Sequence, residues 1–129
     1  MRALLDTHSF LWWVADDKRL SVRARDAIAD RSNLIFFSAV SGWEIAEKVR
    51  LGRLHIGGGD PEIFVPQQVS ANRFEVLSLR LRHALHLHGL PLHHKDPFDR
   101  MLIAQAQLED LVLVTADREI SRYPVHIVW

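Results

Sequence analysis

The segment from Asp96 to Asp117, DPFDRMLIAQAQLEDLVLVTAD, carries the clearest helix signal and the clearest strand signal of the chain. Asp96 is a strong N-cap, because its carboxylate can accept hydrogen bonds from the free amides of the first helical turn, and Pro97 suits the first helical position. Apolar residues then recur at helical spacing, which predicts a helix over Pro97–Leu108. The apolar run Leu111–Thr115 follows and predicts a strand.

The same alternation of strand and helix signals extends outward to both ends of the chain. Further strands are expected at Arg2–Asp6, Leu34–Phe37, Phe74–Leu79 and Val125–Val128. Further helices are expected at Ser9–Ala15, Ser21–Asp30, Ser38–Leu51, Pro61–Asn72 (interrupted by Pro66) and Leu81–His88. Strands alternating with helices indicate an α/β fold, a three-layer α/β/α sandwich with a mainly parallel central sheet. The break at Gly57–Pro61 is not a domain linker, because the pieces beside it are too small to fold alone, so residues 1–129 are expected to form a single domain.

Composition narrows the class of protein. Apolar residues make up 48% of the 129 residues and charged residues 25%, as in ordinary globular domains. The chain has no cysteine, which excludes disulfides and thiolate zinc sites. The longest apolar run, Phe10–Ala15, is far short of the roughly 18 residues that suggest a membrane span. The N-terminus lacks the apolar stretch of a signal peptide, and we therefore expect a cytoplasmic protein.

The charge balance bears on nucleic-acid binding. Sixteen basic and sixteen acidic residues give a formal net charge of zero, which taken alone argues against a nucleic-acid binder. If four acids are committed to a metal ion, the basic residues outnumber the remaining acids. Eight arginines could then contact phosphates or simply form a solvated surface: Arg50, Arg53, Arg73, Arg80, Arg82, Arg100, Arg118 and Arg122.

Four acidic residues either follow an expected strand or lie on the helix after it: Asp6, Glu44, Asp99 and Asp117. The carboxyl ends of parallel strands lie along one edge of a sheet, so residues far apart in sequence would meet there. Crowded carboxylates with no Lys or Arg among them repel one another in low dielectric. A hard divalent cation such as Mg²⁺ or Mn²⁺ removes that cost. The pattern therefore predicts metal-assisted hydrolysis of a phosphodiester.

Most of these acids also have a structural explanation when taken alone. Asp6 could cap the helix that follows it, and Asp117 could serve in a turn after its strand. Asp96 and Asp99 occupy the N-cap and N3 positions of their helix, where capping and the helix dipole account for both. The prediction of a site therefore rests on all four acids falling along one edge.

Glu44 is harder to explain by helix chemistry. The stretch Ser41–Glu44 matches a capping box, but the apolar periodicity already begins at Val40. The helix should then start just after Ser38, which places Glu44 in its second turn, beyond capping reach. The periodicity assigns Trp43 to the buried face, so Glu44 is expected near the core boundary, where an acid needs a partner or a cation.

Five of the eight histidines fall between His83 and His94. His83 and His86 are three residues apart on an expected helix, but no Cys or H-E-x-x-H motif accompanies them. Surface and loop positions are therefore the default interpretation. His94 is the best placed to face the acidic edge, where it could hold a phosphate or orient a carboxylate.

Two adjacent tryptophans, Trp12 and Trp13, cannot both point into one core from a helix. We expect one to pack inside. The other is expected either at a subunit or partner interface, where tryptophan is enriched, or partly buried under a loop.

Four motifs in order along the chain carry a family resemblance. They are Leu4-Leu5-Asp6-Thr7-His8, Ser38-x-x-Ser41-x-Trp43-Glu44-Ile45-Ala46-x-Lys48, His94-x-Asp96-Pro97-Phe98-Asp99-Arg100-x-Leu102-Ile103-Ala104-Gln105-Ala106, and Thr115-x-Asp117. Together they resemble the PIN-domain proteins, in particular the VapC-type toxins of prokaryotic toxin–antitoxin pairs. The resemblance covers essentially the whole chain.

This resemblance implies an endoribonuclease that depends on Mg²⁺ or Mn²⁺, is usually a homodimer and is inhibited by a cognate antitoxin. The acidic quartet of the family falls on Asp6, Glu44, Asp99 and Asp117. Asp96 belongs to the third motif of this subgroup as an auxiliary residue, with His94 beside it. Arg100 could neutralise the phosphate or lie at the surface.

Two other functions are open at the level of sequence. A phosphatase with Asp6 as nucleophile would want a second acid two residues later, where His8 stands. A non-catalytic RNA-binding or protein-binding module on the same fold would have no need for four acids.

Overall fold

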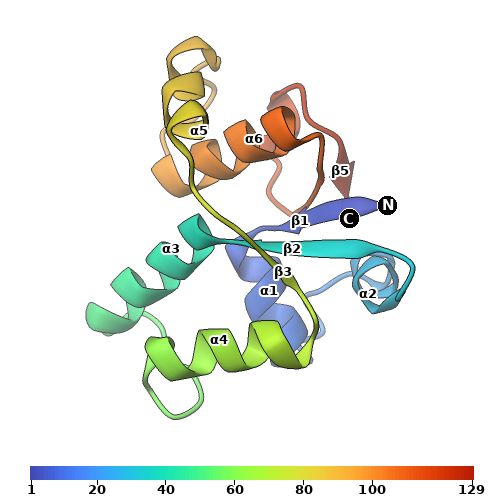
Figure 1. Ribbon diagram of the computed structural model, residues 1–129, viewed down its shortest axis with the longest axis vertical. Coiled ribbons are helices and arrows are strands. Elements are labelled where there is room, and N and C mark those ends of the chain that lie inside the picture. The colour runs from blue at the N-terminus through green and yellow to red at the C-terminus, as the bar shows by residue number, and fades with distance from the viewer.

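A computed structural model describes residues 1–129 and contains one five-stranded, fully parallel sheet (Figure 1). The strand order is β3-β2-β1-β4-β5, so β1 is central and both neighbours pair with it in parallel. The strands are β1 (Arg2–Leu5), β2 (Leu34–Ser38), β3 (Glu75–Leu77), β4 (Val112–Val114) and β5 (Ile127–Val128). The predicted parallel α/β sheet is confirmed.

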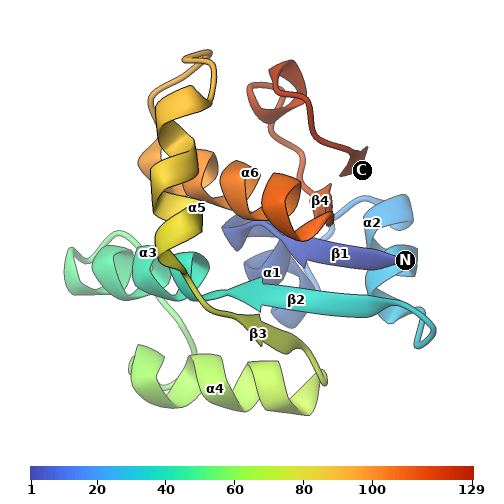
Figure 2. The ribbon, with the colours of Figure 1, turned by 45° about the horizontal axis from the view of Figure 1, so that its top comes forward.

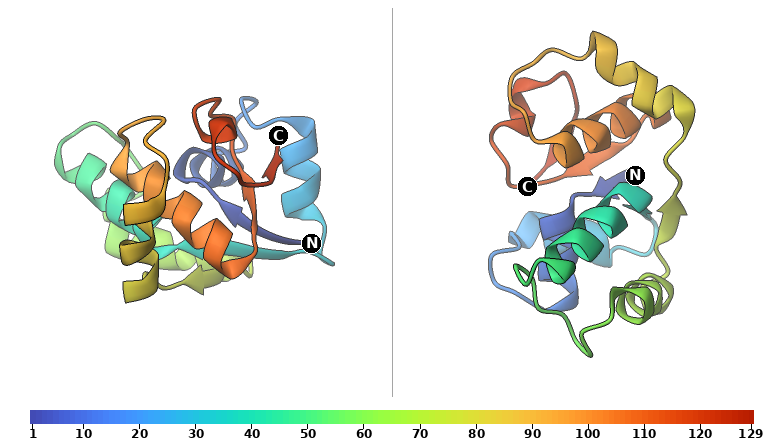
Figure 3. Two further views of the ribbon diagram at one scale, coloured as in Figure 1. Left: turned by 90° about the horizontal axis from the view of Figure 1, so that it is seen from above. Right: turned by 90° about the vertical axis from the view of Figure 1, so that its left-hand side faces the viewer.

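Helices cover both faces of this sheet (Figures 1 and 2). They are α1 (Thr7–Val14), α2 (Val22–Ala29), α3 (Ala39–Arg50), α4 (Pro61–Ala71), α5 (Leu81–His86) and α6 (Pro97–Glu109). Two short 3₁₀ turns, η1 (Leu87–Gly89) and η2 (Ile120–Arg122), complete the chain. Figure 3 shows α5 and α6 together on one side of the sheet, away from α4. No helix is both long enough and apolar enough to cross a membrane.

The alternation of side chains along β1 divides the core in two. Ala3 and Leu5 pack in a cluster with Phe10 of α1 and Val69 of α4, while Leu4 packs in a second cluster with residues of α6. Successive side chains of a strand point to opposite faces, so a strand that is apolar throughout must be covered on both sides. The three-layer sandwich is therefore confirmed.

Most element boundaries agree with the sequence predictions to within a few residues, and two differences are informative. Helix α1 begins at Thr7 rather than Ser9, because Asp6 is its N-cap and accepts a hydrogen bond from Ser9 N at 2.7 Å. Helix α4 runs through Pro66 without a break. Its single buried residue is Val69, so solvent can satisfy the carbonyl that Pro66 leaves unpaired.

The assignment of Trp43 to the buried face is wrong. Its side chain is 53% exposed and meets the Phe98 ring edge-to-face at 4.8 Å between centroids. The buried side of α3 instead carries Val40, Ser41, Glu44 and Ile45. The buried face of α3 is therefore rotated from the predicted one. The prediction failed because this face includes polar residues, which apolar periodicity alone does not detect.

The expectation that one of Trp12 and Trp13 packs fully inside is wrong, since both are partly buried, which was the alternative stated for the second tryptophan. Trp13 Nε1 donates a hydrogen bond to Asn72 Oδ1 at 2.9 Å. Trp12 packs against Trp129 at 5.8 Å between ring centroids. The C-terminal residue therefore supplies the partner that the sequence motif did not reveal.

His83 is fully buried, contrary to the default of a surface histidine. Its Nδ1 accepts a hydrogen bond from Arg80 N at 2.9 Å at the start of α5. The ring proton therefore lies on Nε2 and points to Glu109 Oε1, 2.9 Å away. This histidine joins α5 to α6, and both of its ring nitrogens are engaged in hydrogen bonds.

The N-cap of α6 gives a first test of the fold. Asp96 Oδ1 accepts hydrogen bonds from Phe98 N at 2.9 Å and Asp99 N at 3.1 Å. We expect Asp96→Ala to lower the free energy of unfolding by about 1 kcal/mol in urea titrations, the usual cost of a lost cap. Asp96→Asn is the matched control, because asparagine caps equally well and should unfold close to the wild-type midpoint. Equal loss in both variants would contradict the capping role.

Candidate active site

All four predicted acids lie around the C-terminal edge of the sheet. Asp6 directly follows β1, Glu44 lies on the helix after β2, Asp117 follows β4, and Asp99 is in the first turn of α6. Their charges act on one another, because burial together with Asp96, Asp117, Asp6 and Glu44 raises the pKa of Asp99 to about 8. The structure therefore brings together the four acids that the sequence places far apart.

Asp6 is at once a helix cap and a member of this acidic site. It is 5% exposed, and burial raises the pKa of its carboxyl even though hydrogen bonds from Thr115 and Ser9 lower it. The capping hydrogen bond holds the carboxylate at the N-terminus of α1, where the helix dipole favours negative charge. The structural and functional interpretations of Asp6 are thus compatible.

Glu44 is buried and fully partnered. Thr7 Oγ1 donates a hydrogen bond to Oε1 at 2.6 Å, and Lys48 Nζ pairs with Oε2 at 2.7 Å. The sequence prediction of a site without a basic residue is therefore wrong in this detail. Glu44 and Lys48 are four residues apart on α3, a spacing at which oppositely charged side chains meet, so the pair could have been read from the sequence.

His94, Asp99 and Asp117 form the most compact group in the site, with one ligand atom from each lying within 4.8 Å of the others. Tyr123 determines the proton position on this histidine. Its hydroxyl accepts hydrogen bonds from His94 N (3.2 Å) and Arg100 Nη1 (3.0 Å), so its own proton is directed at His94 Nδ1, 2.8 Å away. The imidazole proton then lies on Nε2, 3.4 Å from Asp99 Oδ2.

The two auxiliary candidates beside Asp99 have structural roles. Asp96 is exposed and caps α6, while its charge contributes to the raised pKa of Asp99. Arg100 is engaged within the chain. Its guanidinium donates to Pro91 O at 2.7 Å and to Tyr123, which holds the loop before α6 against the segment after η2.

Three contributing residues were not singled out as site residues from the sequence: Thr7, Lys48 and Tyr123. Thr7 and Lys48 lie inside the quoted motifs and contact Glu44. No pattern marks Tyr123, because it lies far along the chain from His94 and meets it only in the fold.

The donor set fits a hard divalent cation. Carboxylate oxygens suit ions that prefer oxygen ligands, and His94 serves as a neighbour of Asp99 rather than as a ligand because both of its ring nitrogens are engaged. Burial and then the charges of the neighbouring acids raise the pKa of Asp99, and a bound cation would offset both the burial of the charge and the repulsion.

Comparisons with known proteins agree with this arrangement. The PIN domain model matches residues 3–125. Ribonuclease VapC22 of Mycobacterium tuberculosis is 31% identical over 130 residues, which cover 98% of this chain and 97% of the relative. Among solved structures, VapBC2 from Rickettsia felis bound to a promoter DNA fragment has a TM-score of 0.73 at 15% identity. DNA-bound VapBC from Salmonella typhimurium has a TM-score of 0.71 at 20% identity. The matches cover 98% of this chain and 97% and 96% of those chains, and they show a shared fold.

The raised pKa of Asp99 predicts how stability depends on pH without metal. An unfolded Asp loses its proton near pH ~4, whereas folded Asp99 keeps it until about pH 8. Between these values the native state binds more protons, so the free energy of unfolding should fall as pH rises from 4 to 8. Urea titrations in EDTA at pH 5 and pH 8 measure this fall.

The matched comparison is Asp99→Asn against Asp26→Asn, since Asp26 is an exposed acid on α2 outside the site. Asp99→Asn should flatten the pH dependence and be at least as stable as wild type at pH 8, while Asp26→Asn keeps the wild-type slope. The same slope in both variants would contradict the charge crowding at Asp99.

Proposed function

Because the chain belongs to the PIN-domain family, we propose that its acidic site binds Mg²⁺ or Mn²⁺ and hydrolyses RNA phosphodiester bonds. The chain is a VapC-type ribonuclease, since it aligns over nearly its whole length with Ribonuclease VapC22. Its role is that of the toxin in a toxin–antitoxin pair, and residues 1–129 act as one nuclease domain. The observation that carries the proposal is the meeting of these acids at one edge of the sheet, where burial first and then the neighbouring charges raise the pKa of Asp99 to about 8.

Asp6, Glu44 and Asp99 are assigned as ligands of one or two cations, and Asp117 completes the coordination directly or through water. When bound, the cation would offset negative charge on the scissile phosphate and favour ionisation of the attacking water. Asp96 and His94 support this set from one side, because Asp96 caps the helix that carries Asp99 and His94 Nε2–H faces Asp99.

The other residues of the site hold these carboxylates in position. Thr7 and Lys48 each engage one oxygen of Glu44, so that carboxylate cannot rotate freely. Ser9 N fixes Asp6 through the cap of α1, and Glu119 N donates to Asp117 Oδ1 at 2.9 Å. Ligands fixed before the cation arrives lose little entropy when it binds.

The partners are RNA, a cognate antitoxin and a second copy of the chain. Both structural relatives are toxin–antitoxin complexes by name, which supports an antitoxin here. Apolar side chains exposed on α5 and on the edge strand β3 support a homodimer: Leu81, Leu85 and Val76 are 74%, 65% and 61% exposed. We place the protein in the cytoplasm, where its RNA substrate would be found.

The direct test of catalysis is Asp6→Asn with a labelled RNA and Mn²⁺. Asparagine preserves the cap of α1 but removes an anionic ligand, so circular dichroism should stay native. The cleavage rate should fall by about two orders of magnitude or more, since a metal site contributes several kcal/mol to the transition state. Asp26→Asn is the control and should cleave at the wild-type rate. Full activity of Asp6→Asn would remove this residue from the mechanism.

Metal binding can be tested without any substrate. A ligand that binds only the native state stabilises it by mass action, by about 2.7 kcal/mol at a concentration one hundred times Kd. Mn²⁺ should therefore raise the melting temperature of the wild type at neutral pH, and should raise that of Asp99→Asn by clearly less. An equal rise in both proteins would show that Asp99 is not a ligand. Its remaining role would then be the favourable interaction of its charge with the dipole at the N-terminus of α6.

A further inference from the structure

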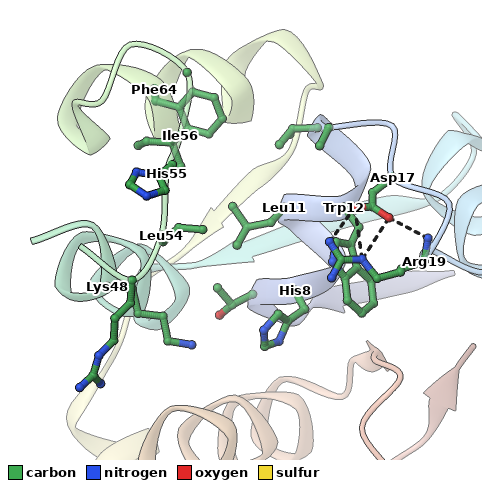
Figure 4. Close-up of a pocket in the computed structure, with 15 residues that line it drawn as sticks. His8, Leu11, Trp12, Asp17, Arg19, Lys48, Leu54, His55, Ile56 and Phe64 are labelled. Carbon is green, nitrogen blue, oxygen red and sulfur yellow. Dashed lines mark hydrogen bonds and ion pairs between the residues drawn. The ribbon is translucent and has the colours of Figure 1, made fainter. Parts of the chain in front are cut away.

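A pocket of about 530 Å³ lies between α1 and the segment that joins α3 to α4 (Figure 4). This volume is within the range of roughly 300–1,000 Å³ that is typical of sites for small ligands. Leu11 and Trp12 line the α1 side, and Leu54, Ile56 and Phe64 line the opposite side. The pocket therefore offers apolar and aromatic walls on both sides of a gap.

The charged residues of this pocket are mostly basic. Arg19, Lys48 and Arg53 line it, against Asp17 as the single acid. Arg19 is paired with Asp17 at 2.8 Å, and Lys48 with Glu44. The exposed Arg53 guanidinium has no hydrogen-bond or ion-pair partner within the chain, so it is available to an anionic ligand.

The pocket is continuous with the acidic site. Thr7 and Lys48 line it, and both also contact the carboxylate of Glu44. His8, the residue after Thr7, adds an exposed ring on the same wall, 5.7 Å from the Trp12 ring centroid. A strand whose scissile phosphate lies at the acids would therefore have its neighbouring nucleotide at the mouth of this pocket.

We propose that this pocket binds the unpaired nucleotide next to the scissile bond of a single-stranded RNA, and that the Arg53 guanidinium contacts a phosphate of that RNA. The assignment rests on the proposed ribonuclease function and adds a substrate site to it. The Trp12 ring already has Arg19 over it at 5.2 Å, so the free aromatic surface is that of Phe64. An aromatic ring among apolar side chains suits a nucleobase, because any base can stack on it. A pocket of about 530 Å³ is of the size that holds one nucleotide, and a base can enter it only when it is unpaired, so we assign a single-stranded substrate at this position. A local basic pocket also lets a chain of zero net charge bind RNA beside an acidic centre.

The test compares Arg53→Glu with Arg31→Glu in steady-state cleavage of a short single-stranded RNA with Mn²⁺. Both arginines are exposed, and both substitutions change the net charge equally, but Arg31 precedes β2 at the opposite edge of the sheet. Arg53→Glu should raise KM by about tenfold or more, the order expected for a lost charge-assisted contact, with kcat nearly unchanged. Arg31→Glu should leave both near wild type, and Arg53→Lys should restore most of the lost affinity.

A binding measurement separates this proposal from the nuclease assignment. Fluorescence anisotropy of the same RNA with Asp6→Asn protein needs no cleavage, and adding Arg53→Glu should weaken that binding by the same factor. A fully paired version of the RNA should compete poorly. If the wild type does not cleave RNA but Arg53→Glu still weakens binding, the nuclease assignment fails and the pocket assignment stands.

Two results would overturn the pocket assignment. One is equal RNA affinity and equal KM for Arg53→Glu and Arg31→Glu. The other is unchanged RNA binding by Arg53→Glu together with loss of inhibition by the antitoxin, which would make the pocket a protein-binding site.

Discussion

Repulsion among carboxylates at one edge of the parallel sheet is the constraint on which this site depends. Four acids from separate segments surround a partly buried position, where burial and then the charges of the neighbouring acids raise the pKa of Asp99 to about 8. A fold does not gather uncompensated negative charge for its own stability, because burial in low dielectric penalises the charged form. The arrangement is explained when a divalent cation is part of the working protein.

The fold supports this unfavourable cluster with interactions that serve structure at the same time. Asp6 caps α1 and Asp96 caps α6. Asp117 accepts a hydrogen bond from a backbone amide in the turn after β4. Lys48 balances part of the charge at Glu44, and the Tyr123 hydroxyl orients His94 toward Asp99. Each carboxylate is held by a local contact, so the site is largely formed before a cation binds.

The sequence predicts the fold well because its strongest signals are local. The apolar runs give the strands, and Asp96 with Pro97 defines the start of α6, as the structure has it. The meeting of the acids also follows from sequence, since parallel strands must end along one edge. The orientation of α3 does not, because its inward face carries Ser41 and Glu44 while Trp43 is exposed.

Contacts between distant segments could not be predicted in this way. The pairing of Trp12 with Trp129 and of His94 with Tyr123 depends on tertiary packing that no local pattern encodes. The salt bridge from Lys48 to Glu44 is different, because its spacing of four residues is a local signal that apolar periodicity overlooked.

The central claim is that charge crowding at Asp99 is relieved by a divalent cation. Carbon-13 NMR of the Asp99 side-chain carboxyl, followed against pH with and without Mg²⁺, measures this directly. We predict a midpoint near pH 8 without metal, as the raised pKa of Asp99 requires, and a midpoint lower by about two units or more in saturating Mg²⁺. A midpoint near the ordinary Asp value of about 3.9 that Mg²⁺ does not move would contradict the account.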